Sequence, residues 1–107
     1  MKKRVALARC LIMHPEIVLF DEPTTGLDPL MGKAIHNLIR ECQKSLHFTA
    51  IIVTHEIPAI FSIVDKVAML YEGKIIAVGT PEEIQASKDP VIHQFIYGEL
   101  EGPISVK

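Results

Sequence analysis

The chain has 107 residues, 49% of them hydrophobic and 22% charged, and its formal net charge is −2 at neutral pH. This length fits one domain at most, and the composition is typical of a soluble globular protein. The weak acidity gives no reason to expect nucleic acid as a partner. No apolar stretch approaches the roughly 20 residues that span a bilayer. The basic N-terminus is not followed by the uninterrupted apolar region of a signal peptide.

The first segment, residues 2–13, has the apolar periodicity of a helix, which His14-Pro15 would end. Its beginning is unusual, because no capping residue precedes it and three cations crowd the end where a helix dipole favours anions. We expect either that the helix begins upstream of Met1 or that an anion belongs there. An ordinary frayed terminus explains the same pattern.

A nearly unbroken apolar run, Ile17 to Asp21, predicts a strand buried on both faces. Asp28-Pro29 looks like a cap followed by proline at the first helical position, so a helix is expected from there to about Leu46. The residues expected on its core face are Ile35, Leu38, Ile39 and Cys42. A second apolar strand follows at Thr49 to Thr54. Strand, helix and strand in this order predict a parallel pair with a right-handed crossover.

The second half of the chain predicts shorter elements. Pro58 opens a short helix, and two strands around Glu72-Gly73 form a hairpin. Two more helices should begin at a capping box and at an Asp-Pro pair. In chain order these elements are the short helix 58–64, the strands 66–71 and 74–78, a helix from Thr80, and a helix from Asp89 that Gly98 ends. The two cysteines, Cys10 and Cys42, fall in predicted helices without metal-ligand spacing, so we expect buried reduced thiols.

Polar side chains gather where the two parallel strands end. Asp21 ends the first strand and Glu22 follows it, and His55 follows the second strand. Ligands of open α/β sheets sit outside the carboxyl ends of the strands, so these three residues stand where a substrate or metal would bind. A carboxylate near a core is costly unless it is paired, hydrogen-bonded or metal-bound. The simpler alternative is an acidic loop after a core strand.

Three motifs in order carry a family resemblance. They resemble the Walker B strand, the D-loop and the switch histidine of ATP-binding cassette (ABC) ATPases, and they lie at Ile17 to Pro23, at Gly26 to Pro29 and at Val53 to Glu56. Residues 1–9 look like the helix that follows the family's signature loop. The resemblance covers nearly the whole chain. It implies an α/β fold that is part of a P-loop NTPase, an ABC nucleotide-binding domain, with parallel strands, a crossover helix, a β-hairpin and C-terminal helices.

The resemblance also assigns roles and cofactors. ATP and Mg²⁺ are the implied cofactors of the complete protein, and Asp21 would hold the metal, through water. Glu22 would polarise or deprotonate the attacking water, and His55 would contact the terminal phosphate and keep water and glutamate in position. Asp28 would face the nucleotide site of a partner subunit, although a plain helix cap explains this residue as well. The four other histidines are given no function.

The last segment of the chain indicates a subgroup within the ABC ATPases. Asp89 to Gly98, followed by Glu101-Gly102-Pro103, is similar to the C-terminal segment of the ATPases of Mla-type phospholipid transporters. The implied partners are a second nucleotide-binding subunit and a membrane permease. The implied location is the cytoplasmic face of the inner membrane, as a peripheral subunit. A generic C-terminal helix that closes an apolar face is the alternative.

The phosphate loop, Gly-x-x-x-x-Gly-Lys-Ser/Thr, does not occur in these 107 residues. In the family this loop cradles the phosphates, and it would lie before Met1. We therefore expect the C-terminal part of a nucleotide-binding domain, with the Walker B to switch-histidine core and hairpin in 1–79 and C-terminal helices and tail in 80–107. Alone, it should neither bind ATP with useful affinity nor hydrolyse it. Unpaired edges and exposed apolar faces should favour aggregation.

Three hypotheses stay open on the sequence alone. The chain is a fragment of an ABC transporter ATPase, the C-terminal half of a split ATPase, or a non-catalytic interaction module that binds a complete ATPase or a membrane subunit. The DNA upstream of Met1 distinguishes them, since only the first two require a phosphate loop encoded nearby. A phosphoacceptor receiver domain also places acids at strand ends, but it does not account for the other two motifs.

Overall fold

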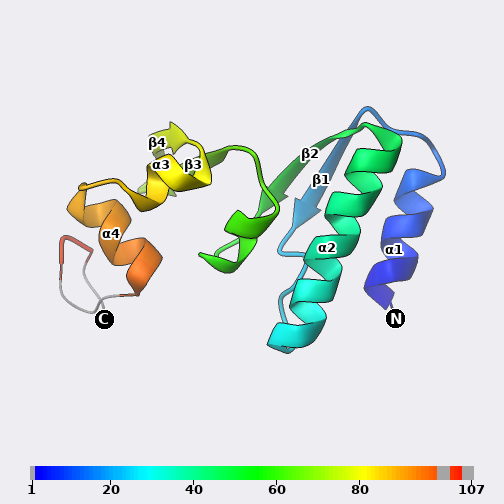
Figure 1. The fold of residues 1–107 in the computed structure, drawn as a ribbon, viewed down its shortest axis with the longest axis horizontal. Helices are drawn as coiled ribbons and strands as arrows, with labels where there is room; N and C mark the ends of the chain where they lie inside the picture. Colours follow the sequence, from blue (N-terminus) through cyan, green and yellow to red (C-terminus); the bar gives the residue numbers. More distant parts are fainter. Residues whose placement is uncertain (1, 99–101, 105–107) are drawn as a thin grey trace. The chain divides into compact units, whose positions relative to one another are not determined.

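The computed structural model describes residues 2–98 and 102–104, and its contacts divide the chain into two compact units, Met1–Ile63 and Val64–Lys107 (Figure 1). The first unit consists of the elements α1 (Lys2–Leu11), β1 (Ile17–Asp21), α2 (Pro29–Leu46), β2 (Thr49–Val53) and the 3₁₀ helix η1 (Ala59–Ser62). The second consists of β3 (Val67–Tyr71), β4 (Lys74–Gly79), α3 (Pro81–Gln85) and α4 (Pro90–Tyr97). No described helix is long and apolar enough to cross a membrane.

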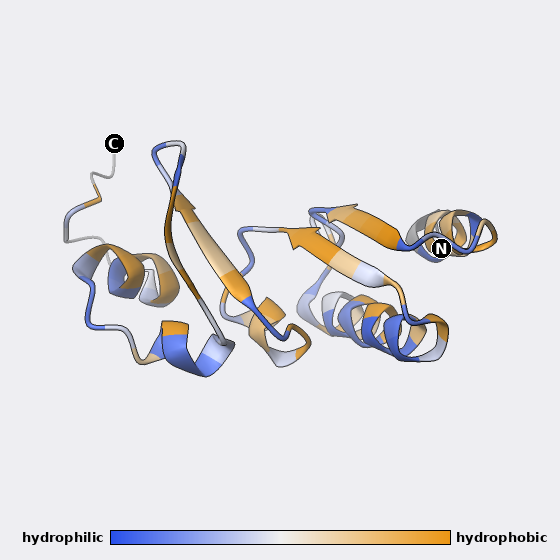
Figure 2. Ribbon diagram, turned by 90° about the horizontal axis from the view of Figure 1, so that it is seen from above, coloured by the Kyte–Doolittle hydropathy of each residue, from blue (hydrophilic) through white to orange (hydrophobic). Residues whose placement is uncertain are grey.

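Two parallel strands form the centre of the first unit, as predicted. β1 and β2 pair in register from Ile17 opposite Thr49 to Asp21 opposite Val53. Figure 2 shows α2 lying along one face of this pair. The core between helix and strands is aliphatic and aromatic, with its most buried members Val18, Ile35, Ile39 and Phe48. Burying each such side chain contributes about 1.5–3 kcal/mol, which holds the helix on the strands.

The prediction that the first strand is buried on both faces was wrong for this chain. Alternate residues of β1 lie on the side away from α2, and Ile17 and Leu19 are 60% and 73% exposed. Across the pair, Ile51 and Val53 of β2 are exposed as well. The reason is that, in the described part of the first unit, α2 covers only one face of the strands. An unbroken apolar run indicates what a strand can bury, and a covering layer decides what it does bury.

The long helix α2 begins and ends where its sequence indicates. Asp28 is the N-cap and its Oδ1 accepts from the Met31 N–H at 2.9 Å, while His47 ends the helix in a left-handed conformation. The buried residues of α2 are Gly32, Ile35, His36 and Ile39, so the predicted core face is rotated slightly, with Leu38 and Cys42 only half-buried. The expectation of a buried thiol was wrong for Cys10, which is exposed near the end of α1.

The second unit is a hairpin followed by two capped helices. Glu72 and Gly73 connect β3 to β4 with φ of +49° and +76°, the pair of positive values that a tight hairpin turn needs. The capping box predicted at Thr80 is present, with both its hydrogen bonds to Glu83. α4 begins after Asp89 and ends at Gly98. Helix starts and stops here follow directly from capping chemistry.

A buried glutamine holds the chain after α4. The side chain of Gln94 is 4% exposed; its Nε2 donates to the Ile104 carbonyl at 2.8 Å and its Oε1 accepts from the Ile104 N–H at 2.7 Å. The Gln94 amide thus satisfies both main-chain groups of Ile104, its N–H and its carbonyl, in the way that a residue of a neighbouring strand does. Of the tail motif noted in the sequence, Glu101 lies outside the described residues.

Candidate functional site

The carboxyl ends of β1 and β2 bring the predicted acids and histidine to one edge of the sheet. Asp21 is the last residue of β1 and pairs with Val53, the last residue of β2. The Glu22 N–H donates to the Val53 carbonyl at 2.7 Å, which extends the pairing by one step. His55 follows two residues after Val53. Parallel pairing in this register therefore places side chains 33 positions apart within reach of each other.

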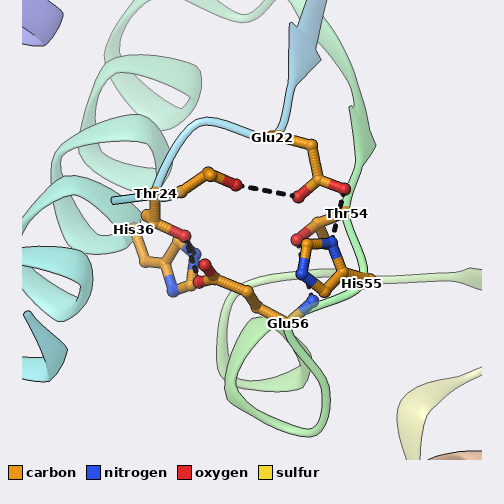
Figure 3. Close-up of polar contacts among 7 residues, drawn as sticks. Glu22, Thr24, His36, Thr54, His55 and Glu56 are labelled. Carbon is orange, nitrogen blue, oxygen red and sulfur yellow. Dashed lines mark hydrogen bonds and ion pairs between the residues drawn. The ribbon is translucent and has the colours of Figure 1, made fainter. Parts of the chain in front are cut away.

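Glu22 and His55 are in direct contact. His55 Nδ1 donates to Glu22 Oε1 at 2.8 Å, and the other oxygen of the carboxylate accepts from the Thr25 hydroxyl at 3.3 Å (Figure 3). The pair is accessible, since the His55 side chain is 71% exposed and that of Glu22 33% exposed. The sequence-based expectation that these residues converge is met; the catalytic roles given to them stay predictions.

This contact changes the acid–base behaviour of both partners. The hydrogen bond from His55 lowers the pKa of Glu22 below its ordinary value of 4.5, with a smaller opposite effect of burial. The hydrogen bond to Glu22 and the charge of its carboxylate raise the pKa of His55 above 6.5. The pair therefore favours an ionised carboxylate beside a protonated imidazole. A carboxylate with a lowered pKa is a weak base, so it is better suited to orient water than to remove its proton completely.

Glu22 has a backbone conformation that L-residues rarely adopt. Its φ is +48°, in the left-handed region, where a side chain costs roughly 1–2 kcal/mol. The turn after it continues through the Thr25 N–H, which donates to the Glu22 carbonyl at 3.3 Å. Strained residues of this kind cluster at functional sites, where the surrounding structure holds them in place. The strain directs the carboxylate back across the strand ends toward His55.

Asp21 fits the role of a magnesium ligand in its chemistry and position. It offers an exposed carboxylate at the end of β1, beside Glu22. Mg²⁺ prefers oxygen ligands and is often held by one or two carboxylates together with substrate phosphates and water. Among the described residues, no group of three or more His, Cys, Asp or Glu side chains could hold a metal by itself. Asp21 is thus suited to a site that substrate oxygens complete, rather than to a closed protein cage.

Asp28 occupies the N-cap of α2, six residues after Glu22. The structure confirms the capping interpretation, because the Asp28 carboxylate accepts the Met31 N–H. The cap engages Oδ1 of Asp28, and the residue as a whole is exposed. The role facing a second subunit stays a prediction.

Three residues near the site were missed by the sequence analysis. Thr24 is 1% exposed and His36 is 4% exposed, and Thr24 donates a hydrogen bond to the carboxylate of Glu56. The sequence assigns His36 no function, yet its Nε2 lies 3.5 Å from the Thr24 hydroxyl oxygen. Thr24 and Glu56 lie within two residues of Glu22 and His55 in the sequence. That adjacency is the signal that could have found them.

Solved structures with a similar fold define the class. The cbiO1 structure from Clostridium perfringens, described as part of the ABC transporter complex cbiONQ, superposes with a TM-score of 0.77 at 42% identity, over 87% of this chain and 37% of that one. An ATP-binding cassette of an ABC transporter, MJ1267 in its ADP conformation, superposes with a TM-score of 0.75 at 26% identity, over 91% of this chain and 39% of that one. The fold is that of part of an ABC ATPase domain.

Curated relatives include ATP-binding proteins named for phospholipid transport. The intermembrane phospholipid transport ATP-binding protein MlaF of Haemophilus influenzae is 38% identical over 100% of this chain and 40% of its own length. MlaF of Escherichia coli K12 is 38% identical over 97% of the chain and 39% of its own length. Protein TRIGALACTOSYLDIACYLGLYCEROL 3 of Arabidopsis thaliana is 41% identical, over 97% of the chain and 35% of its length. The resemblance to ABC ATPases is thereby confirmed.

These relatives are much longer than the chain. The chain spans about two fifths of the MlaF proteins that it matches. A comparison with protein-family models finds no match. The activity of a complete protein therefore enters as a proposal.

Proposed function

We propose that the chain supplies one part of an ATP-hydrolysing nucleotide site in the ATP-binding subunit of an ABC transporter. The observation that carries the proposal is the 2.8 Å contact between His55 Nδ1 and Glu22 Oε1 at the shared ends of β1 and β2. Residues 1–79 contain the Walker B strand, the switch histidine and the hairpin, and 80–107 contain the C-terminal helices and tail. The ATP-binding relatives in transport systems and the ABC domain fold support the same conclusion.

In this site Glu22 orients the attacking water with its ionised carboxylate. His55 uses Nδ1 to hold Glu22, so its Nε2–H is the donor left for an oxygen of the terminal phosphate. The raised pKa of His55 favours the doubly protonated ring, which can make both contacts at once. Asp21 would hold Mg²⁺, which neutralises charge on the phosphates when bound. Phosphoryl transfer needs little besides this positioning and electrostatic stabilisation.

The cargo we propose is phospholipid. Support comes from the MlaF proteins, named for intermembrane phospholipid transport, which match essentially the whole chain. By analogy the working unit is a dimer of nucleotide-binding subunits, in which Asp28 faces the partner, docked on a membrane permease at the cytoplasmic face of the inner membrane. The cargo test is ATP-dependent phospholipid movement between vesicles that carry the permease of an MlaF system.

The function is tested in a chimaera. The part of Haemophilus MlaF that precedes the matched segment is fused to this chain, and ATP affinity and turnover are measured for the parent and for Glu22→Gln. We expect the parent chimaera to hydrolyse ATP. Glu22→Gln should leave nucleotide affinity within about threefold while lowering turnover about 100-fold or more, because the amide keeps the shape but loses the charge that orients water. The chain alone, without a phosphate loop, should bind ATP no better than millimolar.

Two results would contradict the proposal. One is a Glu22→Gln chimaera that turns over ATP at nearly the parent rate. The other is tight ATP binding by the chain alone. Glu41→Gln, an exposed exchange of the same chemistry in the middle of α2, is the control and should leave turnover unchanged. A folded chimaera that binds no nucleotide with any variant would favour the interaction-module hypothesis.

A further inference from the structure

A polar cluster of Thr24, His36 and Glu56 lies beside the Glu22–His55 pair (Figure 3). Among the residues of the first unit whose burial the structure describes, Thr24 and His36 are the two most buried polar ones, 1% and 4% exposed. The Thr24 hydroxyl donates to Glu56 Oε2, and His36 Nε2 lies 3.5 Å from the same hydroxyl oxygen. Polar groups are costly to bury unless they are hydrogen-bonded, and the hydrogen bonds within the cluster offset that cost.

The cluster connects the two loops that carry the reactive pair. Thr24 is two residues after Glu22 and Glu56 is the residue after His55, so their hydrogen bond joins positions 32 apart in the sequence. The Glu56 N–H also donates to the Thr54 hydroxyl at 3.0 Å, which fixes the turn on which His55 sits. Hydrogen bonds to a carboxylate are roughly twice as strong as neutral ones. This one therefore restrains the loop after β2 against the loop after β1.

The number of available protons determines which group donates each hydrogen bond in the cluster. The single hydroxyl proton of Thr24 goes to the Glu56 carboxylate, which can only accept, so His36 must donate through Nε2–H to the threonine oxygen. Burial lowers the pKa of His36, against a smaller opposing effect of Glu56. A neutral ring protonated at Nε2 satisfies this geometry. The direction of donation is then His36 to Thr24 to Glu56.

We propose that Glu56 is a positioning residue: held by Thr24, it fixes the Thr54–Glu56 turn so that His55 Nδ1 stays on Glu22. The hydrogen bonds of Glu56 go to Thr24 and Thr54, so its restraint on His55 is transmitted through the backbone of the turn, and its charge adds a minor effect on the pKa of His55. The catalytic meaning of that restraint rests on the proposed function. The restraint itself is a property of the chain and is measurable without nucleotide.

The test compares Thr24→Val, which keeps the shape of the side chain and removes the hydroxyl, with Thr24→Ser, which restores it. Amide hydrogen exchange at Glu56 reports the turn, and the amide of Glu22, bonded to Val53, reports the strand pairing. The Nδ1–H resonance of His55 reports its contact with Glu22. We expect Thr24→Val to speed exchange at Glu56 about tenfold and to broaden the Nδ1–H resonance, while Glu22 exchanges as before.

Thr24→Ser should behave as the parent. Thr49→Val, an exposed threonine of β2 outside the cluster, is the matched control and should change neither signal. If Thr24→Val disturbs the fold, Glu56→Gln serves instead, because Glu56 is only half-buried and the amide still accepts from Thr24; about threefold faster exchange is expected.

Unchanged exchange at Glu56 and an unchanged Nδ1–H resonance in both variants would overturn the proposal. Equal acceleration at Glu56 and Glu22 would overturn it too, because the cluster would then stabilise the first unit as a whole without positioning His55. Neither result depends on ATP turnover. The proposed function can therefore fail in the chimaera while the restraint is present, and the restraint can be absent while the chimaera hydrolyses ATP.

Discussion

Glu22 and His55 determine each other's protonation, and the sign of the effect can be worked out for each. The pKa of His55 is raised above 6.5, so its contribution to stability is complete below pH 6.5 and is lost as the pH rises through the raised value. The pKa of Glu22 is lowered below 4.5, so its contribution is complete above pH 4.5 and is lost as the pH falls through the lowered value. The contact is therefore strongest between pH 4.5 and 6.5.

Replacing Glu22 by Gln should lower the pKa of His55 toward its ordinary value. The amide removes the carboxylate charge and weakens the hydrogen bond, the two main causes of the shift. It leaves burial, which lowers the pKa of His55, and the smaller effect of the Glu56 charge, which raises it. The measurement is an NMR titration of the His55 ring in the parent, in Glu22→Gln and in the control Glu41→Gln. A pKa of His55 that is the same in all three would show that the contact does not persist in solution.

The strained backbone of Glu22 makes a second prediction at the same position. Glu22→Gly and Glu22→Ala both remove the carboxylate, but only glycine adopts φ of +48° without a steric cost. We expect the glycine variant to be more stable than the alanine variant by about 1 kcal/mol in urea unfolding. At Glu41, inside α2, the order should reverse by a similar amount, because glycine is unfavourable in a helix. Alanine as the more stable variant at both positions would contradict the strain.

Among the elements, α4 offers the clearest test, because one side chain ties it to the following chain. Gln94→Ala removes both hydrogen bonds to Ile104 from a buried position, so we expect a loss of about 2 kcal/mol in the free energy of unfolding. Amide exchange at Ile104 should speed up accordingly. Gln85→Ala, an exposed glutamine at the end of α3, should stay within about 0.5 kcal/mol of the parent. If both variants unfold alike, the Gln94 contact contributes nothing in solution.

Elements with local signals were predictable from the sequence. Asp28-Pro29 gave the start of α2, and the Thr80 capping box gave the start of α3, because caps act within one turn of chain. The helix predicted over residues 2–13 ends two residues earlier, at Leu11, because the fraying of a helix end has no sharp sequence signal. The short helix after Pro58 is a 3₁₀ helix only four residues long. The exposure of Leu19 was not predictable from its own strand, because exposure depends on which layers pack there.

At the site, too, some contacts were predictable from the sequence and others were not. Convergence of Glu22 and His55 followed from strand order alone, since parallel strands end at one edge. The contact of Thr24 with Glu56 did not, because it depends on how two loops turn back behind that edge. Loop conformation is set by long-range packing, which periodicity does not report.

For the molecule as a whole, the exposed face of β1 and β2 has a direct consequence. Ile17, Leu19, Ile51 and Val53 form an apolar surface on the side away from α2. Contiguous apolar surface of this kind favours association in water.

In the proposed site, Glu22 and His55 act as one unit on a bound phosphate. The most direct test of this coupling is the turnover of ATP by the chimaera carrying Glu22→Gln, His55→Ala, or both. We predict that each single variant loses about 100-fold or more in kcat and that the double variant loses no more than the worse single one, as residues acting together do. Losses that multiply in the double variant, or a His55→Ala chimaera that turns over ATP at the parent rate, would contradict the account.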